Sequence, residues 1–108
     1  MRRLMERYAY YNLRHFDGAL RPIPVRFSRR LRRRLGYYRL PGSKGGTREI
    51  VVSYRHLRRH GWHEVFETLL HEMIHQWQDQ TGLTVDHGGQ FRAKAREVGV
   101  LPRARRPV

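Results

Sequence analysis

Two histidines and a glutamate in the spacing HExxH are the residues of this chain best suited to metal chemistry. They are His71, Glu72 and His75, and they lie in an apolar stretch with helical periodicity. On a helix, residues i and i+4 lie on one face one turn apart, so both imidazoles can bind a single metal ion. Glu72 then lies next to the ion and can reach a water bound to it. The pattern predicts a catalytic metal site, provided that the chain supplies a third ligand.

The third ligand must be sought outside this motif, because a catalytic zinc usually has three protein ligands and one open position. Asp79 continues the same helix face, but eight residues of helix separate it from His71 by about 12 Å, too far to share an ion. Thr81 stands where a metzincin would have its third histidine, which excludes that pattern. His87 and Glu97 remain as candidates. We prefer His87, because it follows a helix-ending glycine and precedes a new helix.

Supporting groups for the metal site are also predicted. Glu67 precedes His71 by four residues, and Asp79 follows His75 by four. Either carboxylate could accept the outer N–H of a ligand histidine and fix its tautomer. A hydroxyl or imidazole side chain could also stabilise an oxyanion. The candidates are Tyr37, Tyr38, Tyr54, His56, His60 and His63.

Three helices and three strands are predicted around this motif from hydrophobic periodicity and turn residues. Helices are expected over residues 2–16, 62–80 and 89–98, and a short helical turn is expected from Ser53 to His60 before Gly61. Strands are expected over residues 22–28, 35–40 and 48–53, the last two forming a hairpin. The sequence therefore predicts one α+β domain over residues 1–101 and a basic C-terminal tail over residues 102–108.

The composition narrows the chemistry and the partners. The chain has no cysteine, which excludes disulfides, thiolate metal sites and cysteine nucleophiles, so a metal must be bound by His, Asp or Glu. No apolar stretch is long enough to span a membrane. We therefore expect a cytoplasmic protein with no membrane partner, and the nucleoid is an alternative location.

The net charge of +14 is concentrated outside the metal motif. Residues 1–60 carry 17 of the 23 basic residues and three of the nine acidic ones, whereas residues 61–100 are mildly acidic. Such asymmetry favours a polyanionic partner, most simply DNA, bound through its phosphates. The densest run is predicted to make these contacts, and it consists of Arg29, Arg30, Arg32, Arg33 and Arg34.

These motifs resemble the SprT-like (Spartan-like) zinc metalloprotease family. The resemblance rests on HExxH within residues 68–75, on HGxxF over residues 87–91, and on the opening stretch of residues 12–20 followed by a strand. It implies a zincin-like α+β fold in which an edge strand lines the active site and binds the substrate antiparallel. Residues 48–53 are our candidate for that strand.

The resemblance also implies a site and a function. It makes His71, His75 and His87 the ligands of one Zn²⁺ and Glu72 the catalytic acid and base, acting on a protein or peptide substrate that is associated with DNA. Many family members carry a C-terminal zinc ribbon for DNA binding. This chain has no cysteine, so DNA contact must come from its arginines.

Two other functions are compatible with parts of the sequence. One is a basic DNA-binding module with a structural zinc, which an intact Glu72 and an open fourth ligand position disfavour. The other is a metal-dependent ribonuclease with three histidines. It is disfavoured by Glu72 and by Thr81, because such enzymes place the third histidine close behind the second.

Overall fold

The computed structural model describes residues 2–42 and 44–100. It confirms the predicted α+β class, with three helices and a three-stranded mixed sheet. The elements in chain order are α1 (Arg2–Phe16), β1 (Val25–Ser28), β2 (Gly36–Arg39), β3 (Glu49–Ser53), α2 (Tyr54–Gln80) and α3 (Gly89–Val98). The predicted basic tail, residues 102–108, lies outside the described residues, and the domain limits stay a prediction.

The sheet has the order β1-β3-β2, with β1 parallel and β2 antiparallel to the central strand β3. The predicted hairpin between β2 and β3 is thus confirmed. The prediction that residues 48–53 form an edge strand is wrong, because β3 is the central strand. Ile50, Val51 and Val52 are all fully buried, and a continuous apolar run of this kind is typical of a central strand covered on both faces. The edge positions belong to β1 and β2.

Helix α2 is the longest element, and it has a break near its start. The side chain of Ser53 accepts a hydrogen bond from the His56 backbone, which caps the first turn as predicted. Gly61 has φ +85° and ψ 178°, so the backbone leaves the helical conformation there before the longer segment begins. The helix ends at Gln80, followed by Thr81 and by Gly82 at φ +81°, a left-handed conformation that favours glycine.

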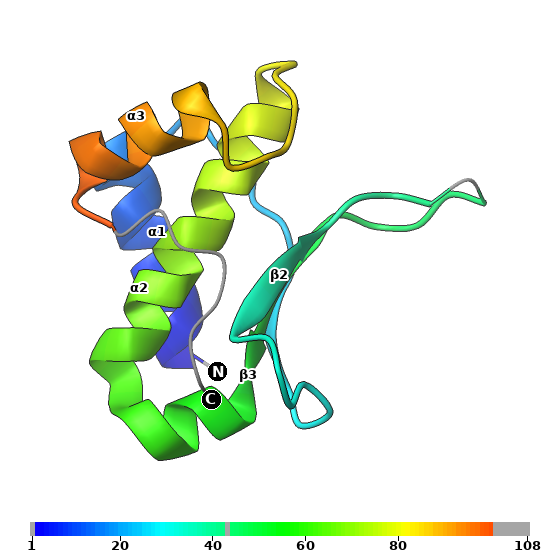
Figure 1. The fold of residues 1–108 in the computed structure, drawn as a ribbon, viewed down its shortest axis with the longest axis vertical. Coiled ribbons are helices and arrows are strands. Elements are labelled where there is room, and N and C mark those ends of the chain that lie inside the picture. Colours follow the sequence, from blue (N-terminus) through cyan, green and yellow to red (C-terminus); the bar gives the residue numbers. More distant parts are fainter. Residues whose placement is uncertain (1, 43, 101–108) are drawn as a thin grey trace.

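The hydrophobic core lies between the sheet and the helices. Figure 1 shows the three helices on one side of the molecule and the strands on the other, with α2 nearest the sheet. Leu4 and Tyr8 of α1 and Phe91 and Ala95 of α3 are buried against this core, as their helical spacing predicts. The two arms of the hairpin connection extend away from the body (Figure 1). The longest helix therefore contacts both the sheet and the remaining helices, and it carries the HExxH motif.

Candidate metal centre

Three histidine side chains converge on one point. His71 and His75 extend from α2, and His87 comes from the turn before α3. The Nε2 atom of His87 lies 3.2 Å from that of His71 and 3.1 Å from that of His75. The structure thus brings together the three histidines that the sequence indicated, from two separate segments of the chain.

The ring of Phe91 packs against all three imidazoles of this cluster. Its side chain is fully buried, and its ring centroid lies 4.8 Å from His71, 4.7 Å from His75 and 4.8 Å from His87. The ring of His75 stacks on it at an interplanar angle of 25°. Because Phe91 is on the first turn of α3, the start of that helix fixes the orientation of all three imidazoles.

The cluster fits a divalent metal ion. Metal–nitrogen bonds of about 2.0–2.1 Å in a tetrahedral site place ligand nitrogens about 3.3–3.4 Å apart, close to the observed separations. Burial lowers the pKa of His75 and of His87, which favours the neutral imidazole that ligates metals. Three imidazole donors suit several first-row metals, zinc among them.

Gln78, which the sequence did not single out, holds this arrangement together. Its side chain is fully buried, and its Oε1 lies 2.9 Å from Nδ1 of His75. The same oxygen accepts a hydrogen bond from the Asp86 backbone, and its amide nitrogen donates to the Asp86 carboxylate, so the orientation of the amide is fixed. His75 must therefore carry its proton on Nδ1, which leaves the Nε2 lone pair directed at the cluster. Gln78 also ties the segment before His87 to α2.

Glu72 directly follows His71 on α2, with only 5% of its surface exposed. Burial raises the pKa of Glu72 to about 8, although the charge of Arg34 and a backbone hydrogen bond from Tyr38 act in the opposite direction. A cation held by the neighbouring histidines would further favour the ionised form. The carboxylate is thus a buried group of raised proton affinity.

Strand β2 approaches α2 closely at the level of this carboxylate. A Cβ atom at Gly36 would lie 2.8 Å from the carbonyl oxygen of Val51 and 3.0 Å from Cγ2 of Thr68 on α2. Only glycine therefore permits this packing distance. Two residues further along β2, the Tyr38 backbone reaches Glu72. The edge strand that lines the candidate site is β2.

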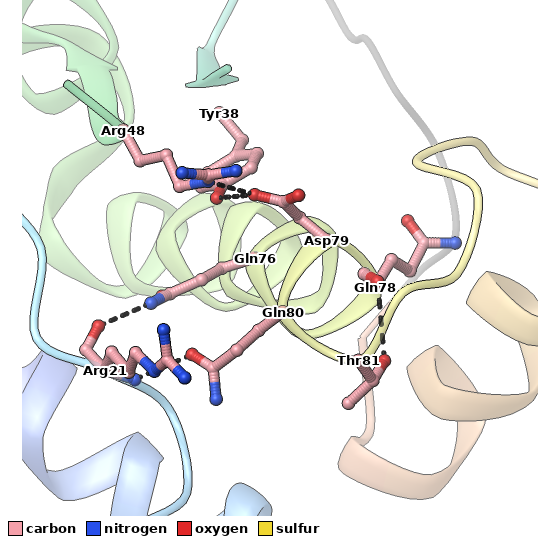
Figure 2. Close-up of polar contacts among 8 residues, drawn as sticks. All are labelled: Arg21, Tyr38, Arg48, Gln76, Gln78, Asp79, Gln80 and Thr81. Atoms are coloured by element: carbon pink, nitrogen blue, oxygen red, sulfur yellow. Dashed lines mark hydrogen bonds and ion pairs between the residues drawn. The ribbon is translucent and has the colours of Figure 1, made fainter. Parts of the chain in front are cut away.

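The last turn of α2 anchors surrounding segments through polar side chains (Figure 2). Asp79 accepts hydrogen bonds through Oδ2 from the Tyr38 hydroxyl at 2.5 Å and from Nε of Arg48 at 2.6 Å. Gln76 and Gln80 both contact the backbone of Arg21, in the segment that follows α1. Each of these contacts crosses at least 31 residues of sequence, so the turn that follows His75 joins distant parts of the fold to the metal helix.

A family model gives the decisive comparison, because the SprT-like family matches residues 4–106, nearly the whole chain. The chain belongs to the SprT-like family. None of the curated proteins searched matches it. The matched region includes the three histidines, Glu72 and Phe91, so the geometry above belongs to the part of the chain that defines this SprT-like domain.

The two other carboxylates of the SprT-like domain that were considered for the site, those of Asp79 and Glu97, have partners outside the histidine cluster. Asp79 does not contact His75 but binds the hairpin, so its predicted role beside the metal is wrong, and Gln78 takes that position. Glu97 is paired with Lys94 at 2.7 Å on the exposed side of α3, away from the histidine cluster. The preference for His87 over Glu97 agrees with this geometry.

Glu67 stays a prediction as a supporting group. Its carboxylate lies in a second cluster on α2, within 4.8 Å of ligand atoms of His63 and Glu64. Two candidate oxyanion donors are engaged elsewhere: the Tyr38 hydroxyl donates to Asp79, and the buried His56 lies 3.0 Å from the Thr68 hydroxyl.

Of the five predicted nucleic-acid contacts, the structure places two at one hollow of the surface. Arg29 and Arg30 line an open hollow of about 580 Å³ together with Arg26, Phe27, Ser28, Leu31 and Tyr37. The guanidinium of Arg29 lies 4.3 Å from the centroid of Tyr54. The guanidinium of Arg34 lies 5.2 Å from the centroid of Tyr37, which also lines the hollow, and its charge lowers the pKa of both Glu72 and His75. Arg34 therefore belongs to the surroundings of the metal centre.

No helix within residues 2–42 and 44–100 of the SprT-like domain has the length and apolar character needed to cross a membrane.

Proposed function

We propose that this SprT-like domain is a zinc-dependent metallopeptidase in which Glu72 acts as general base and then as general acid. The observation that carries the proposal is the convergence of three imidazoles, those of His71, His75 and His87, on the helix where the buried Glu72 directly follows His71. A Zn²⁺ bound by these histidines supplies a water of lowered pKa and polarises the scissile carbonyl.

The residues of the chain supply the proton transfers. Glu72 takes a proton from the attacking water and later gives it to the leaving amine. Its burial supports both steps, because a carboxylate with raised proton affinity is a better base, and the protonated form survives until the amine leaves. The Tyr38 backbone and the charge of Arg34 favour the ionised carboxylate from which the cycle starts.

The edge of β2 supports an extended peptide as the substrate. In the described sheet, β2 pairs with β3 on one side only, and the Tyr38 backbone on its other side faces Glu72. A peptide that adds to this edge as a further strand would pass directly beside the carboxylate. The same addition to β3 is blocked by its neighbours on both sides.

The test compares the wild-type protein with Glu72→Gln and with Glu97→Gln, an exposed glutamate on α3 as the matched control. Metal content is measured by mass spectrometry, and cleavage is measured on an unfolded protein and on a DNA-binding protein. We expect Glu72→Gln to keep its zinc and to lose about 10²–10⁴-fold of the rate, the usual contribution of general acid–base catalysis. Equal activity of all three proteins would refute the role of Glu72.

Two other outcomes would replace the proposal. Zinc binding and DNA binding without cleavage by any form would favour a structural zinc in a DNA-binding module. Cleavage of RNA in place of protein would favour a metal-dependent nuclease.

We further propose that the substrates are proteins associated with DNA. The exposed arginines around the hollow beside β1 support this, because clustered cations bind phosphates independently of sequence. Replacement of Arg29 and Arg30 by Gln should lower the affinity for DNA and reduce the slope of its salt dependence by about two, because each arginine neutralises one phosphate. Replacement of Arg92 and Arg96 on α3 is the control. An unchanged slope would exclude phosphate binding at the hollow.

A further inference from the structure

We propose that Tyr38, Asp79 and Arg48 form a latch that positions the edge strand β2 against the active-site helix, so that the Tyr38 backbone stays on Glu72. This inference deepens the proposed peptidase function and rests on it for its catalytic consequence. Its structural part, that the latch fixes the position of β2, does not depend on any activity.

The first observation is that one face of α2 contacts β2 at successive levels. Thr68 packs against Gly36, and Glu72 receives the backbone hydrogen bond of Tyr38. Asp79 follows Glu72 by seven residues, which returns it to nearly the same face two turns further on. There its carboxylate accepts a hydrogen bond from the Tyr38 hydroxyl. The strand is thus held along α2 over about three turns of helix.

The second observation is that Tyr38 is bound at both of its ends. Its backbone is hydrogen-bonded to Glu72, and its hydroxyl donates to Oδ2 of Asp79 at 2.5 Å. A shift of the side chain therefore shifts the backbone group that orients the catalytic carboxylate. Gly36, whose lack of a side chain lets the strand approach α2, offers no side-chain contact that could hold the strand in place.

The third observation is that Arg48 joins the other arm of the hairpin to the same oxygen. Its Nε donates to Oδ2 of Asp79 at 2.6 Å, and Figure 2 shows Tyr38 and Arg48 meeting the carboxylate from the same side. Arg48 immediately precedes β3, opposite the end of β2, where Arg39 pairs with Glu49. The latch thus binds both strands at the level where the hairpin leaves the body of the domain.

The pKa shifts of Asp79 and Tyr38 agree with a stable hydrogen bond between them. Burial raises the pKa of Asp79, but the hydrogen bonds from Arg48 and Tyr38 outweigh this and leave it below the usual range. Burial and the hydrogen bond to Asp79 raise the pKa of the Tyr38 hydroxyl. At neutral pH the carboxylate is therefore charged and the phenol is protonated, which are the forms that the contact needs.

The test uses Asp79→Ala, Asp79→Asn and Tyr38→Phe in the zinc-loaded chain of residues 1–108. Glu97→Ala is the matched control, because it removes an exposed ion pair of 2.7 Å to Lys94 that is remote from β2. Hydrogen exchange is measured at the Tyr38 amide, together with zinc content, folded fraction, and kcat and KM for a peptide substrate. Asp79→Asn keeps an oxygen acceptor for both partners. Tyr38→Phe removes only the hydroxyl, so it still tests the latch if Asp79→Ala does not fold.

We expect the Tyr38 amide to exchange about tenfold faster in Asp79→Ala and in Tyr38→Phe, as local opening becomes easier, with wild-type rates in Glu97→Ala. We expect kcat to fall about tenfold at unchanged zinc content and folded fraction, since small displacements of a catalytic group are costly. Asp79→Asn should restore most of the protection and most of the kcat.

Each negative result has a distinct meaning. Wild-type exchange at Tyr38 in both Asp79→Ala and Tyr38→Phe would overturn the latch. A decrease in kcat that only follows the folded fraction would reduce the latch to a stabilising contact and overturn its positioning role. A wild-type protein that cleaves no peptide would refute the peptidase proposal alone, because the exchange rates would still decide whether Asp79 holds β2.

Discussion

Gln78 offers the sharpest test of how the metal centre is built. Replacement by Ala removes the acceptor 2.9 Å from Nδ1 of His75 and both hydrogen bonds to Asp86, in a side chain that is fully buried. The hydrogen bonds to Asp86 are long, at 3.3 and 3.4 Å, so the bond to His75 carries most of the effect. Leaving a buried donor without its acceptor costs about 1–3 kcal/mol. We therefore expect zinc affinity to fall by about 10- to 100-fold.

The assay is a competition for Zn²⁺ between the protein and a chromogenic chelator at neutral pH, at a temperature where each variant is folded. Gln80→Ala is the matched control, because Gln80 lies on the same turn of α2 and binds the backbone of Ala19 and Arg21 but no histidine. If Gln78→Ala binds zinc within twofold of the wild type, Gln78 does not fix the tautomer of His75. The same conclusion follows if Gln80→Ala weakens zinc binding to the same extent.

Three further predictions concern the packing and charge around the site. Gly36→Ala should destabilise the fold by about 1–3 kcal/mol in denaturant unfolding, because the new methyl group would lie 2.8 Å from the Val51 carbonyl oxygen. Gly89→Ala is the control and should leave the stability unchanged, because its methyl group would have no atom within 4 Å. Hydrogen bonds from two arginines lower the pKa of Glu49, so its stabilising contribution is present above its unfolded pKa and lost as pH falls through the folded value. The stability difference between wild type and Glu49→Gln should thus be largest at pH 7 and shrink as the pH falls below about 4.3, the usual glutamate pKa. A difference of unchanged size down to the lowest pH at which both proteins stay folded would contradict it. Phe91→Leu should weaken zinc binding about tenfold in the chelator assay, because the ring stacked under His75 is removed; unchanged affinity would show that the ring does not orient the ligand.

The sequence was most informative where the geometry is local. HExxH places His71 and His75 on one helix face through helical periodicity alone, and the structure has them there. Glycines at the ends of helical patterns also predicted the break at Gly61 and the stop at Gly82. These features depend on residues within one or two turns of each other.

The errors lie where partners are distant in sequence. Asp79 has the right spacing to support His75, but its carboxylate is bound by a tyrosine and an arginine from a hairpin 31 or more residues away. The placement of β3 at the centre of the sheet depends on parallel pairing with β1, which no local pattern encodes. One signal could have been used, since the uninterrupted apolar run from Ile50 to Val52 favours a central strand.

The polar residues after His75 show why this end of the helix was difficult to interpret. Read alone, a helix end rich in glutamine resembles a solvated surface, yet Gln76 is 1% exposed and Gln78 fully buried. Buried amides must be hydrogen-bonded, and each here binds a different segment: Gln76 binds Tyr8 of α1, and Gln78 binds the turn before His87. Asp79, on the same turn, binds the hairpin. This one turn of helix therefore fixes α1, the edge strand and the third histidine relative to the HExxH motif. The arrangement needs polar side chains, because apolar contacts alone would bury the same surface without setting the tautomer of His75 or the position of Tyr38.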